Sequence, residues 1–235
     1  MMGTQNNQMA LPISGDDKKS FDNFLIGKNQ ELVAALQDFP QAQEHRVVFF
    51  YGKEGSGKTH LGLSAARASQ ALGRSTHFLS LSDPNIIPEL LEVIDVAGLV
   101  CVDDADAWAG DSKKERALFT LFEQIKHAGG ILFISAKHSP EACGFTLRDL
   151  VSRLGSGLIY SIAELDDAER LEALKMRARH RGLSVNDDAL KYLVTRLSRN
   201  SHELFKFLDH MDKASLVEKR KITIPFLQSL LQNQS

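Results

Sequence analysis

The eight residues from Gly52 to Thr59 have the spacing G-x-x-x-x-G-K-[ST], which is typical of loops that bind nucleotide phosphates. In full the loop reads Gly52-Lys53-Glu54-Gly55-Ser56-Gly57-Lys58-Thr59. Its glycines allow backbone N–H groups to turn toward a phosphate, and a helix that begins behind the loop adds a positive dipole end. We expect Lys58 to reach the β- and γ-phosphates and Thr59 to offer its hydroxyl to Mg²⁺, with His60 next to them.

A second group of reactive side chains follows two apolar runs. Asp103 and Asp104 come directly after residues 99–102, as the acids of a Walker B segment do. We expect Asp103 to hold Mg²⁺ and Asp104 to orient or deprotonate an attacking water. Ser135 follows residues 131–134 and is predicted to sense the γ-phosphate or to hold that water; a serine in an ordinary turn is the alternative.

The elements that must position these groups alternate along the chain. Apolar runs predict five buried strands, separated by helical stretches, at residues 47–51, 76–81, 99–103, 131–135 and 158–162. Strands with helical crossovers form a parallel sheet that helices cover on both faces. The fold class is therefore α/β, with the phosphate loop between a strand and a helix.

The character of the sequence changes after Ala163. Helical apolar spacing without a strand-like run is found over residues 166–181, 186–199, 201–217 and 225–231. We predict three parts: a tail over residues 1–20, a nucleotide-binding α/β domain over 21–163 and an all-helical domain over 164–235.

Composition limits the class of protein. A formal net charge of -2 argues against a strongly basic nucleic-acid clamp, and 43% apolar residues are enough to form a packed core. The two cysteines, Cys101 and Cys143, have neither metal-ligand spacing nor the pattern of a disulfide framework. No run of about 18 apolar residues occurs. We therefore expect a cytoplasmic protein without a membrane span.

Taken together, these motifs resemble the AAA+ ATPases, and within them the bacterial replication initiator DnaA, over residues 20–231. Phe21-Asp22-Asn23-Phe24 with Gly27 is similar to the segment that opens the DnaA nucleotide domain, and residues 152–158 are similar to its arginine-finger box. The resemblance implies an AAA+ P-loop NTPase fold with a five-stranded sheet and a helical lid. It also implies bound ADP or ATP with Mg²⁺ and assembly as a homo-oligomer.

The resemblance also assigns a role to Arg153. It implies that this arginine points into the ATP site of a neighbouring subunit, where an arginine supplied in trans can raise hydrolysis by about 10³ to 10⁵-fold. The structural alternative is a surface arginine that pairs with Asp149 or another nearby acid.

The tail carries a short peptide that is similar to the clamp-binding motif of truncated DnaA relatives. It reads Gln8-Met9-Ala10-Leu11-Pro12 and fits the pattern Q-x-x-L-P. Leu11 would fill an apolar pocket and Gln8 would fix the register of an extended peptide. The implied partner is the sliding clamp, the β subunit of DNA polymerase III, and the implied target is DnaA.

Four further features add expectations, and two of them leave alternatives open. His202 stands where DnaA has an arginine near the phosphates, which implies weak or no intrinsic hydrolysis. The base pocket is expected to include Phe24, Leu25 and Ile26. Trp108 is either a subunit contact or a packing residue. A basic cluster is either a solvated helix face or a weak DNA contact, and comprises Arg170, Lys175, Arg177, Arg179, His180 and Arg181.

The leading hypothesis is a regulator that, together with the clamp, stimulates hydrolysis of the ATP bound to DnaA. A self-contained P-loop phosphotransferase or NTPase is the enzyme alternative, and it requires several lid arginines on an acceptor. A DNA-binding helicase loader is the third hypothesis, and it predicts salt-sensitive binding to single-stranded DNA.

Overall fold

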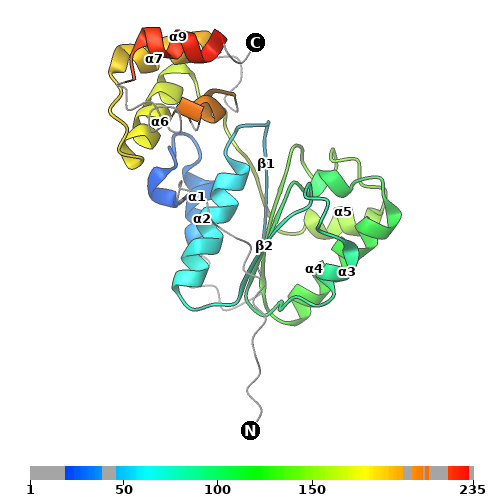
Figure 1. The fold of residues 1–235 in the computed structure, drawn as a ribbon. Helices are drawn as coiled ribbons and strands as arrows, with labels where there is room; N and C mark the ends of the chain where they lie inside the picture. Colours follow the sequence, from blue (N-terminus) through cyan, green and yellow to red (C-terminus); the bar gives the residue numbers. More distant parts are fainter. Residues whose placement is uncertain (1–18, 39–45, 198–202, 209, 212–221, 233–235) are drawn as a thin grey trace.

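The structure is a computed structural model that describes residues 19–38, 46–197, 203–208, 210–211 and 222–232. An α/β part with a central sheet carries a smaller helical part at one end (Figure 1). The peptide Gln8 to Pro12 and His202 lie outside the described residues.

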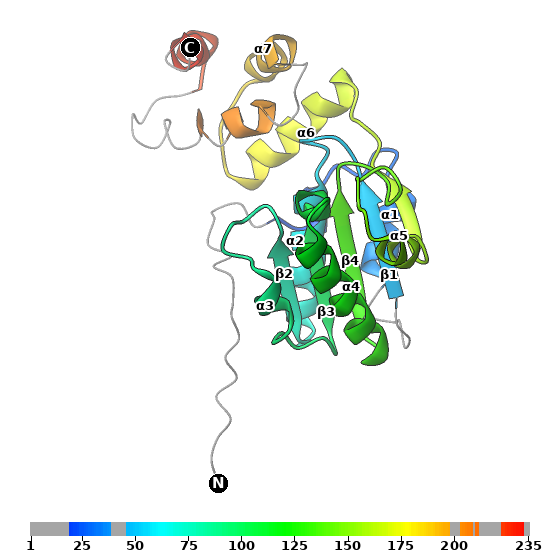
Figure 2. The ribbon, with the colours of Figure 1, turned by 90° about the vertical axis from the view of Figure 1, so that its right-hand side faces the viewer.

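The sheet has five parallel strands, as the alternating pattern predicts, and the structure places them in the order β2-β3-β4-β1-β5. The strands are β1 (Arg46–Tyr51), β2 (Thr76–Ser80), β3 (Leu99–Asp103), β4 (Ile131–Ala136) and β5 (Leu158–Ser161). Their carboxyl ends face the helical part (Figure 2). Strand β4 lies between β1 and β3, so the segments that follow all three strands meet at one edge.

The expectation of five buried strands is wrong for the two edge strands, since only Leu79 of β2 is buried and no residue of β5 is. Leu158 and Ile159 are 45% and 40% exposed, because β5 is an edge strand with a single neighbour, β1. By contrast, every residue of β3 and β4 is buried.

Helices cover both faces of the sheet (Figure 1). One face carries α1 (Gln30–Gln37) and α2 (Lys58–Ala71), and the other carries α3 (Pro88–Leu91), α4 (Ser112–His127) and α5 (Arg148–Leu154). Two short 3-10 helices are η1 (Phe21–Asn23) and η3 (Ala105–Trp108).

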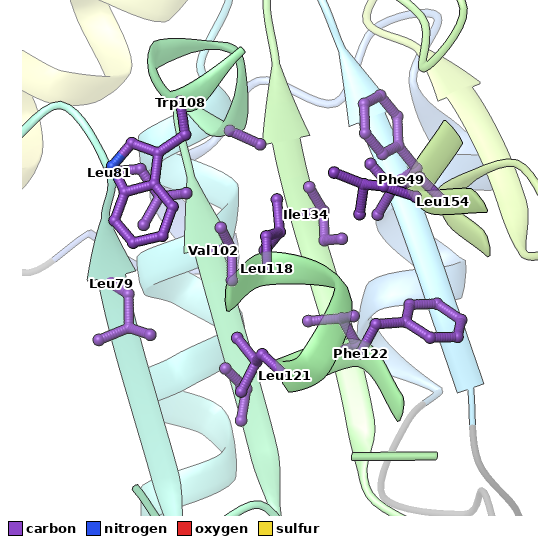
Figure 3. Close-up of a cluster of buried hydrophobic side chains, with 14 of the residues drawn as sticks. Phe49, Leu79, Leu81, Val102, Trp108, Leu118, Leu121, Phe122, Ile134 and Leu154 are labelled. Carbon is purple, nitrogen blue, oxygen red and sulfur yellow. The ribbon is translucent and has the colours of Figure 1, made fainter. Parts of the chain in front are cut away.

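The core on the α4 side is built from large apolar side chains. Leu118, Leu121 and Phe122 of α4 are almost fully buried against the sheet, and Leu154 of α5 lies near Phe49 of β1 (Figure 3). Burying a side chain of this size contributes roughly 1.5 to 3 kcal/mol relative to leaving it exposed. This packing fixes α4 and α5 relative to β1, the strand that leads into the phosphate loop.

Trp108 belongs to the same core and is 1% exposed, which supports its packing role and not a subunit contact. Cys101 and Cys143 are free and buried. Burial raises the pKa of the Cys143 thiol to about 11, so it stays protonated near neutral pH. Both cysteines therefore act as packing residues.

The helical part contains α6 (Asp167–His180), α7 (Asp187–Leu197), the helical segment 203–208 and α9 (Ile224–Gln232). Their apolar faces form a separate core that includes Leu174, Leu193 and Leu208. Helix α6 begins at a reciprocal cap, since the backbone N–H of Glu169 donates to Asp166 Oδ1 and that of Asp166 donates to Glu169 Oε2, both at 2.9 Å. Among the described residues, no helix is long and apolar enough to cross a membrane.

Candidate functional site

The phosphate loop joins β1 to α2 and bends through two glycines with positive φ. Gly55 has φ 78° and Gly57 has φ 101°, in the region that side chains other than glycine rarely adopt. Gly57 is the N-cap of α2, so the first N–H groups of the helix face the loop. The loop has the shape that the motif requires.

Lys58 lies inside this loop and is only 6% exposed. Its Nζ donates to the backbone carbonyls of Gly52 at 2.7 Å and Lys53 at 3.0 Å. Burial lowers the pKa of the Lys58 ammonium, and the carboxylates of Asp104 and Asp103 partly offset that effect. These two bonds hold the Lys58 ammonium against the backbone of the loop.

Two further observations fit a phosphate in the loop. The hydroxyl Oγ of Ser56 is buried and has no hydrogen-bond partner among the described residues. A Cβ added to Gly52 would lie 2.8 Å from that same oxygen, so the backbone approaches the Ser56 side chain closely. An unsatisfied hydroxyl, an ammonium and a helix N-terminus together suit an anion.

Asp103 ends β3 and is the centre of a buried hydrogen-bond group. Thr59 Oγ1 donates to its Oδ2 at 2.6 Å, and Ser135 Oγ makes a short hydrogen bond to its Oδ1. Burial raises the pKa of the Asp103 carboxyl, while the bonds from Ser135 and Thr59 oppose the rise. The three residues predicted from separate segments thus lie together, because Val102 pairs with Ile134 and the next residues of β3 and β4 are adjacent.

The donor set fits Mg²⁺ in the way that the motif predicts. A threonine hydroxyl and a carboxylate are hard oxygen ligands, and Mg²⁺ in such sites takes its remaining ligands from phosphates and water. Within the described part of the chain, no group of three or more His, Cys, Asp or Glu side chains could hold a metal ion. Thr59 and Asp103 would hold the ion, with phosphate oxygens and water as its other ligands.

Asp104 adopts a left-handed backbone conformation, with φ 55°, which is unusual for a residue other than glycine. Its N–H donates to Ser135 Oγ at 3.3 Å and its Oδ2 accepts from Ser82 Oγ at 2.9 Å. The left-handed turn separates the directions of the two acids, so Asp103 faces Thr59 while Asp104 faces Ser82. Sequence reasoning missed Ser82, which lies in the loop after β2.

The segment around Phe24 packs on the phosphate loop. A methyl group added to Gly57 would lie 2.7 Å from Cε2 of Phe24, and the Phe24 ring centroid lies 5.5 Å from that of His60. Ile26 is 39% exposed. The structure brings Phe24 to the loop, and the lining of a base pocket by Phe24, Leu25 and Ile26 stays a prediction.

His60, in the first turn of α2, links three segments. Its ring is 3% exposed, with Nε2 2.9 Å from the carbonyl of Ser20 and Nδ1 3.1 Å from Nη2 of Arg177 in α6. The interpretation of the basic cluster as a solvated face is therefore wrong for Arg177.

Other members of the basic cluster are paired with acids. Arg170 forms an ion pair with Asp167, and Lys175 forms ion pairs with Glu172 and Asp187. The side chains of Arg170 and Lys175 are only 16% exposed. The cluster is thus partly neutralised, and weak DNA contact stays a prediction that no observation here supports.

Arg153, in the last turn of α5, forms an ion pair with a residue that sequence reasoning did not identify. Its Nε lies 2.7 Å from Oε1 of Glu123 in α4, and the two side chains are 42% and 38% exposed. The pair with a nearby acid, which was the structural alternative, is therefore present, and the acid is Glu123 and not Asp149. No hydrogen bond involves the terminal Nη nitrogens of Arg153 within the described residues.

Glu115 fixes the start of α5. This carboxylate is fully buried in α4 and accepts from the backbone N–H groups of Gly110, Thr146 and Leu147 at 2.6 to 3.1 Å. The Thr146 hydroxyl donates to it as well, at 3.0 Å. Glu115 therefore ties the loop after β3 to the helix that carries Arg153.

The fold and the phosphate loop together define a P-loop protein of the AAA+ class. The chain belongs to the bacterial DnaA ATPase-domain family, whose model matches residues 16–161. The helical part matches the model of the Hda lid domain over residues 167–231. This is therefore a DnaA-related AAA+ protein close to Hda, and the matches support a DnaA-related regulator of DNA replication with a nucleotide-binding domain.

Solved structures agree on the fold. Domain III of the Thermotoga maritima replication initiation protein DnaA superposes with a TM-score of 0.76 at 16% identity, covering 92% of this chain and 96% of that one. AMPPCP-bound DnaA from Aquifex aeolicus gives 0.62 at 21% identity, covering 79% and 61%. The Thermotoga maritima RuvB branch migration motor gives 0.64 at 18% identity, covering 91% and 71%. The predicted AAA+ fold with a helical lid is confirmed.

Proposed function

We propose that this protein binds an adenine nucleotide with Mg²⁺ and regulates DnaA by presenting Arg153 to the ATP that DnaA holds. The peptide from Gln8 to Pro12 tethers it to the sliding clamp, the β subunit of DNA polymerase III. The result is faster hydrolysis of ATP on DnaA and an inactive initiator.

The proposal of an adenine nucleotide is supported by the site and by relatives. Lys58, the unsatisfied Ser56 hydroxyl and the N-terminus of α2 converge on the loop. The Aquifex aeolicus DnaA structure is described as AMPPCP-bound. In this protein Thr59 and Asp103 would hold Mg²⁺, which neutralises developing phosphate charge when it is bound. His202, which lies outside the described residues, is the reason that we propose weak or no intrinsic hydrolysis.

The observation that carries the proposal is the position of Arg153. Its guanidinium is half-exposed at the end of a short helix, and its only described partner contacts Nε, which leaves both Nη groups for another molecule. Planar guanidinium groups suit phosphate oxygens because they donate two parallel hydrogen bonds. An exposed ion pair such as Arg153–Glu123 is worth about 0 to 1 kcal/mol, so it does not prevent contact with a triphosphate.

The clamp peptide is proposed from the sequence alone. Burying Leu11 is worth only about 1.5 to 3 kcal/mol, so one tail should bind weakly. A second tail in an oligomer, or a clamp already loaded on DNA, would raise the effective affinity. We accordingly propose action as a homo-oligomer on DNA-loaded clamp, with DNA contact that is indirect or weak.

The test measures the decay of labelled ATP bound to DnaA when the protein and DNA-loaded clamp are added. We expect faster decay with the wild-type protein and a loss of about 10³-fold or more of the stimulation with Arg153→Ala. Arg148→Ala is the matched control, because Arg148 is an exposed arginine in the same helix. Leu11→Ala should weaken only the binding to the clamp, so an excess of this variant should restore the stimulation of ATP hydrolysis. Undiminished stimulation by Arg153→Ala would refute the proposal.

The two alternatives remain open to direct tests. A phosphotransferase needs lid arginines that converge on an acceptor, whereas Arg170 pairs with Asp167 and Arg177 contacts His60. Phosphate transfer to nucleosides or nucleotides would favour it. Salt-sensitive binding to single-stranded DNA would favour the helicase loader.

A further inference from the structure

One side chain of the lid reaches the helix that begins at the phosphate loop. Arg177 Nη2 lies 3.1 Å from His60 Nδ1, and these residues are 117 positions apart in the sequence. Helix α6 lies beyond the end of α2 in both ribbon views (Figures 1 and 2). His60 directly follows Thr59, so the contact is adjacent to the residues that face the phosphates.

The direction of this hydrogen bond follows from the other side of the ring. His60 Nε2 lies 2.9 Å from the carbonyl oxygen of Ser20, which can only accept. The hydrogen of the neutral ring is therefore on Nε2, and Nδ1 accepts from the guanidinium of Arg177. Because the ring is 3% exposed, water does not compete easily for either nitrogen.

The guanidinium of Arg177 is also held from the lid side. Its Cζ lies 4.1 Å from the ring centroid of Phe205, in the helical segment 203–208. A cation over an aromatic face contributes about 0.5 to 1 kcal/mol where it is exposed and more where it is desolvated. Arg177 thus joins two lid helices to the phosphate-loop helix.

We propose that Arg177 is a positioning residue that holds the lid on the phosphate-loop helix and so slows the release of a bound nucleoside diphosphate. The inference rests on the proposed nucleotide binding. Moving the lid away from α2 breaks the bond to His60. If the nucleotide leaves from such an open form, any loss of this contact raises the open fraction and the release rate by the same factor.

The experiment follows the dissociation of a fluorescent ADP analogue with Mg²⁺ during a chase with excess ADP. Hydrogen bonds to charged groups are strong enough for Arg177→Gln to accelerate release about tenfold or more. Arg177→Lys should give an intermediate rate, since lysine keeps a charged donor without the planar stack on Phe205. Arg179→Gln is the matched control, because Arg179 is exposed on the same helix.

Phe205→Leu is the second variant and should accelerate release about two- to fivefold, through loss of the stacked ring. Thermal unfolding without nucleotide checks that each variant is folded. Release at the wild-type rate from folded Arg177→Gln, or equal acceleration by Arg179→Gln, would overturn the inference. A wild-type protein that binds no ADP analogue at equilibrium would instead refute the proposed nucleotide binding itself, and the inference with it.

Discussion

Arg153 of α5 and Glu123 of α4 form an ion pair in which the carboxylate approaches the side of the guanidinium, with Nε 2.7 Å from Oε1. This oxygen of Glu123 is buried and does not have hydrogen-bond geometry with any described partner. The pair therefore restrains the direction of Arg153 without using its Nη groups. A restrained arginine side chain loses less conformational entropy when it binds a phosphate.

Glu123→Gln should reduce the stimulation of ATP hydrolysis on DnaA by up to about fivefold, since exposed ion pairs are worth up to about 1 kcal/mol. The reason is a less ordered Arg153 side chain, so the rate at saturating protein should fall while the half-saturating concentration stays unchanged. Thermal unfolding should change little. A variant as active as wild type, in a protein whose Arg153→Ala form is inactive, would show that Glu123 does not position the arginine.

Glu115→Gln tests the tie between α4 and the start of α5. The amide accepts on one oxygen only, and its NH₂ group faces backbone donors, so unfolding free energy near pH 7 should fall by about 2 to 3 kcal/mol. Urea denaturation measures this, with Glu31→Gln as the control because Glu31 is exposed. If both variants unfold at the same urea concentration, the buried carboxylate does not stabilise the fold.

The loss of unfolding free energy caused by Glu115→Gln should become smaller at acid pH. Burial alone would raise the pKa of Glu115, but hydrogen bonds from Thr146, Leu147 and Gly110 outweigh it and lower the pKa below its ordinary value of 4.5. Because the pKa of Glu115 is lower in the folded than in the unfolded protein, the charged carboxylate stabilises the fold fully above about pH 4.5. This stabilisation is lost as the pH falls through the pKa of the folded protein. The stability gap between wild type and Glu115→Gln should therefore narrow below about pH 4.5, whereas a gap that is constant with pH would exclude a charged Glu115.

Much of the site follows from local sequence. The loop Gly52–Thr59 has fixed spacing, and the apolar runs before Asp103 and Ser135 identify strands whose carboxyl ends must share an edge. The contacts of Asp103 with Thr59 and Ser135 are a consequence of that topology. Such a site is predictable because each segment carries its own signal.

Contacts between helices were not predictable in this way. Glu123, Glu115 and Arg177 stand on amphipathic helices, where a charged residue normally indicates a solvated face. Which of them turns toward a neighbouring element depends on how the helices pack, and no local pattern records that. The exposure of β5 has the same origin, since an apolar run such as Leu158-Ile159 does not show whether its strand lies at an edge.

Gly57→Ala should weaken nucleotide binding at least about tenfold and reduce stability by about 1 to 2 kcal/mol. The residue has φ 101°, and an added Cβ would lie 2.7 Å from the Phe24 ring. Gly73→Ala separates the two effects, because Gly73 has φ 72° but nothing within 4 Å of an added Cβ. Calorimetric titration with ADP and urea denaturation would measure both quantities. Combining Gly57→Ala with Phe24→Leu should restore part of the stability if the Phe24 ring contributes to the cost.

Ser135→Ala should destabilise the protein by about 1 to 3 kcal/mol, because it leaves Asp103 Oδ1 and the N–H of Asp104 short of a partner in a buried site. Loss of that bond also frees the Asp103 carboxylate to rotate, so the Mg²⁺ concentration needed for half-maximal ADP binding should rise. Urea denaturation and a Mg²⁺ titration of ADP affinity measure the two effects, and Ser112→Ala, at an exposed position, should change neither. A folded Ser135→Ala protein with wild-type stability and an unchanged Mg²⁺ requirement would mean that Ser135 does not orient Asp103, and would leave contact with the γ-phosphate or water as its remaining role.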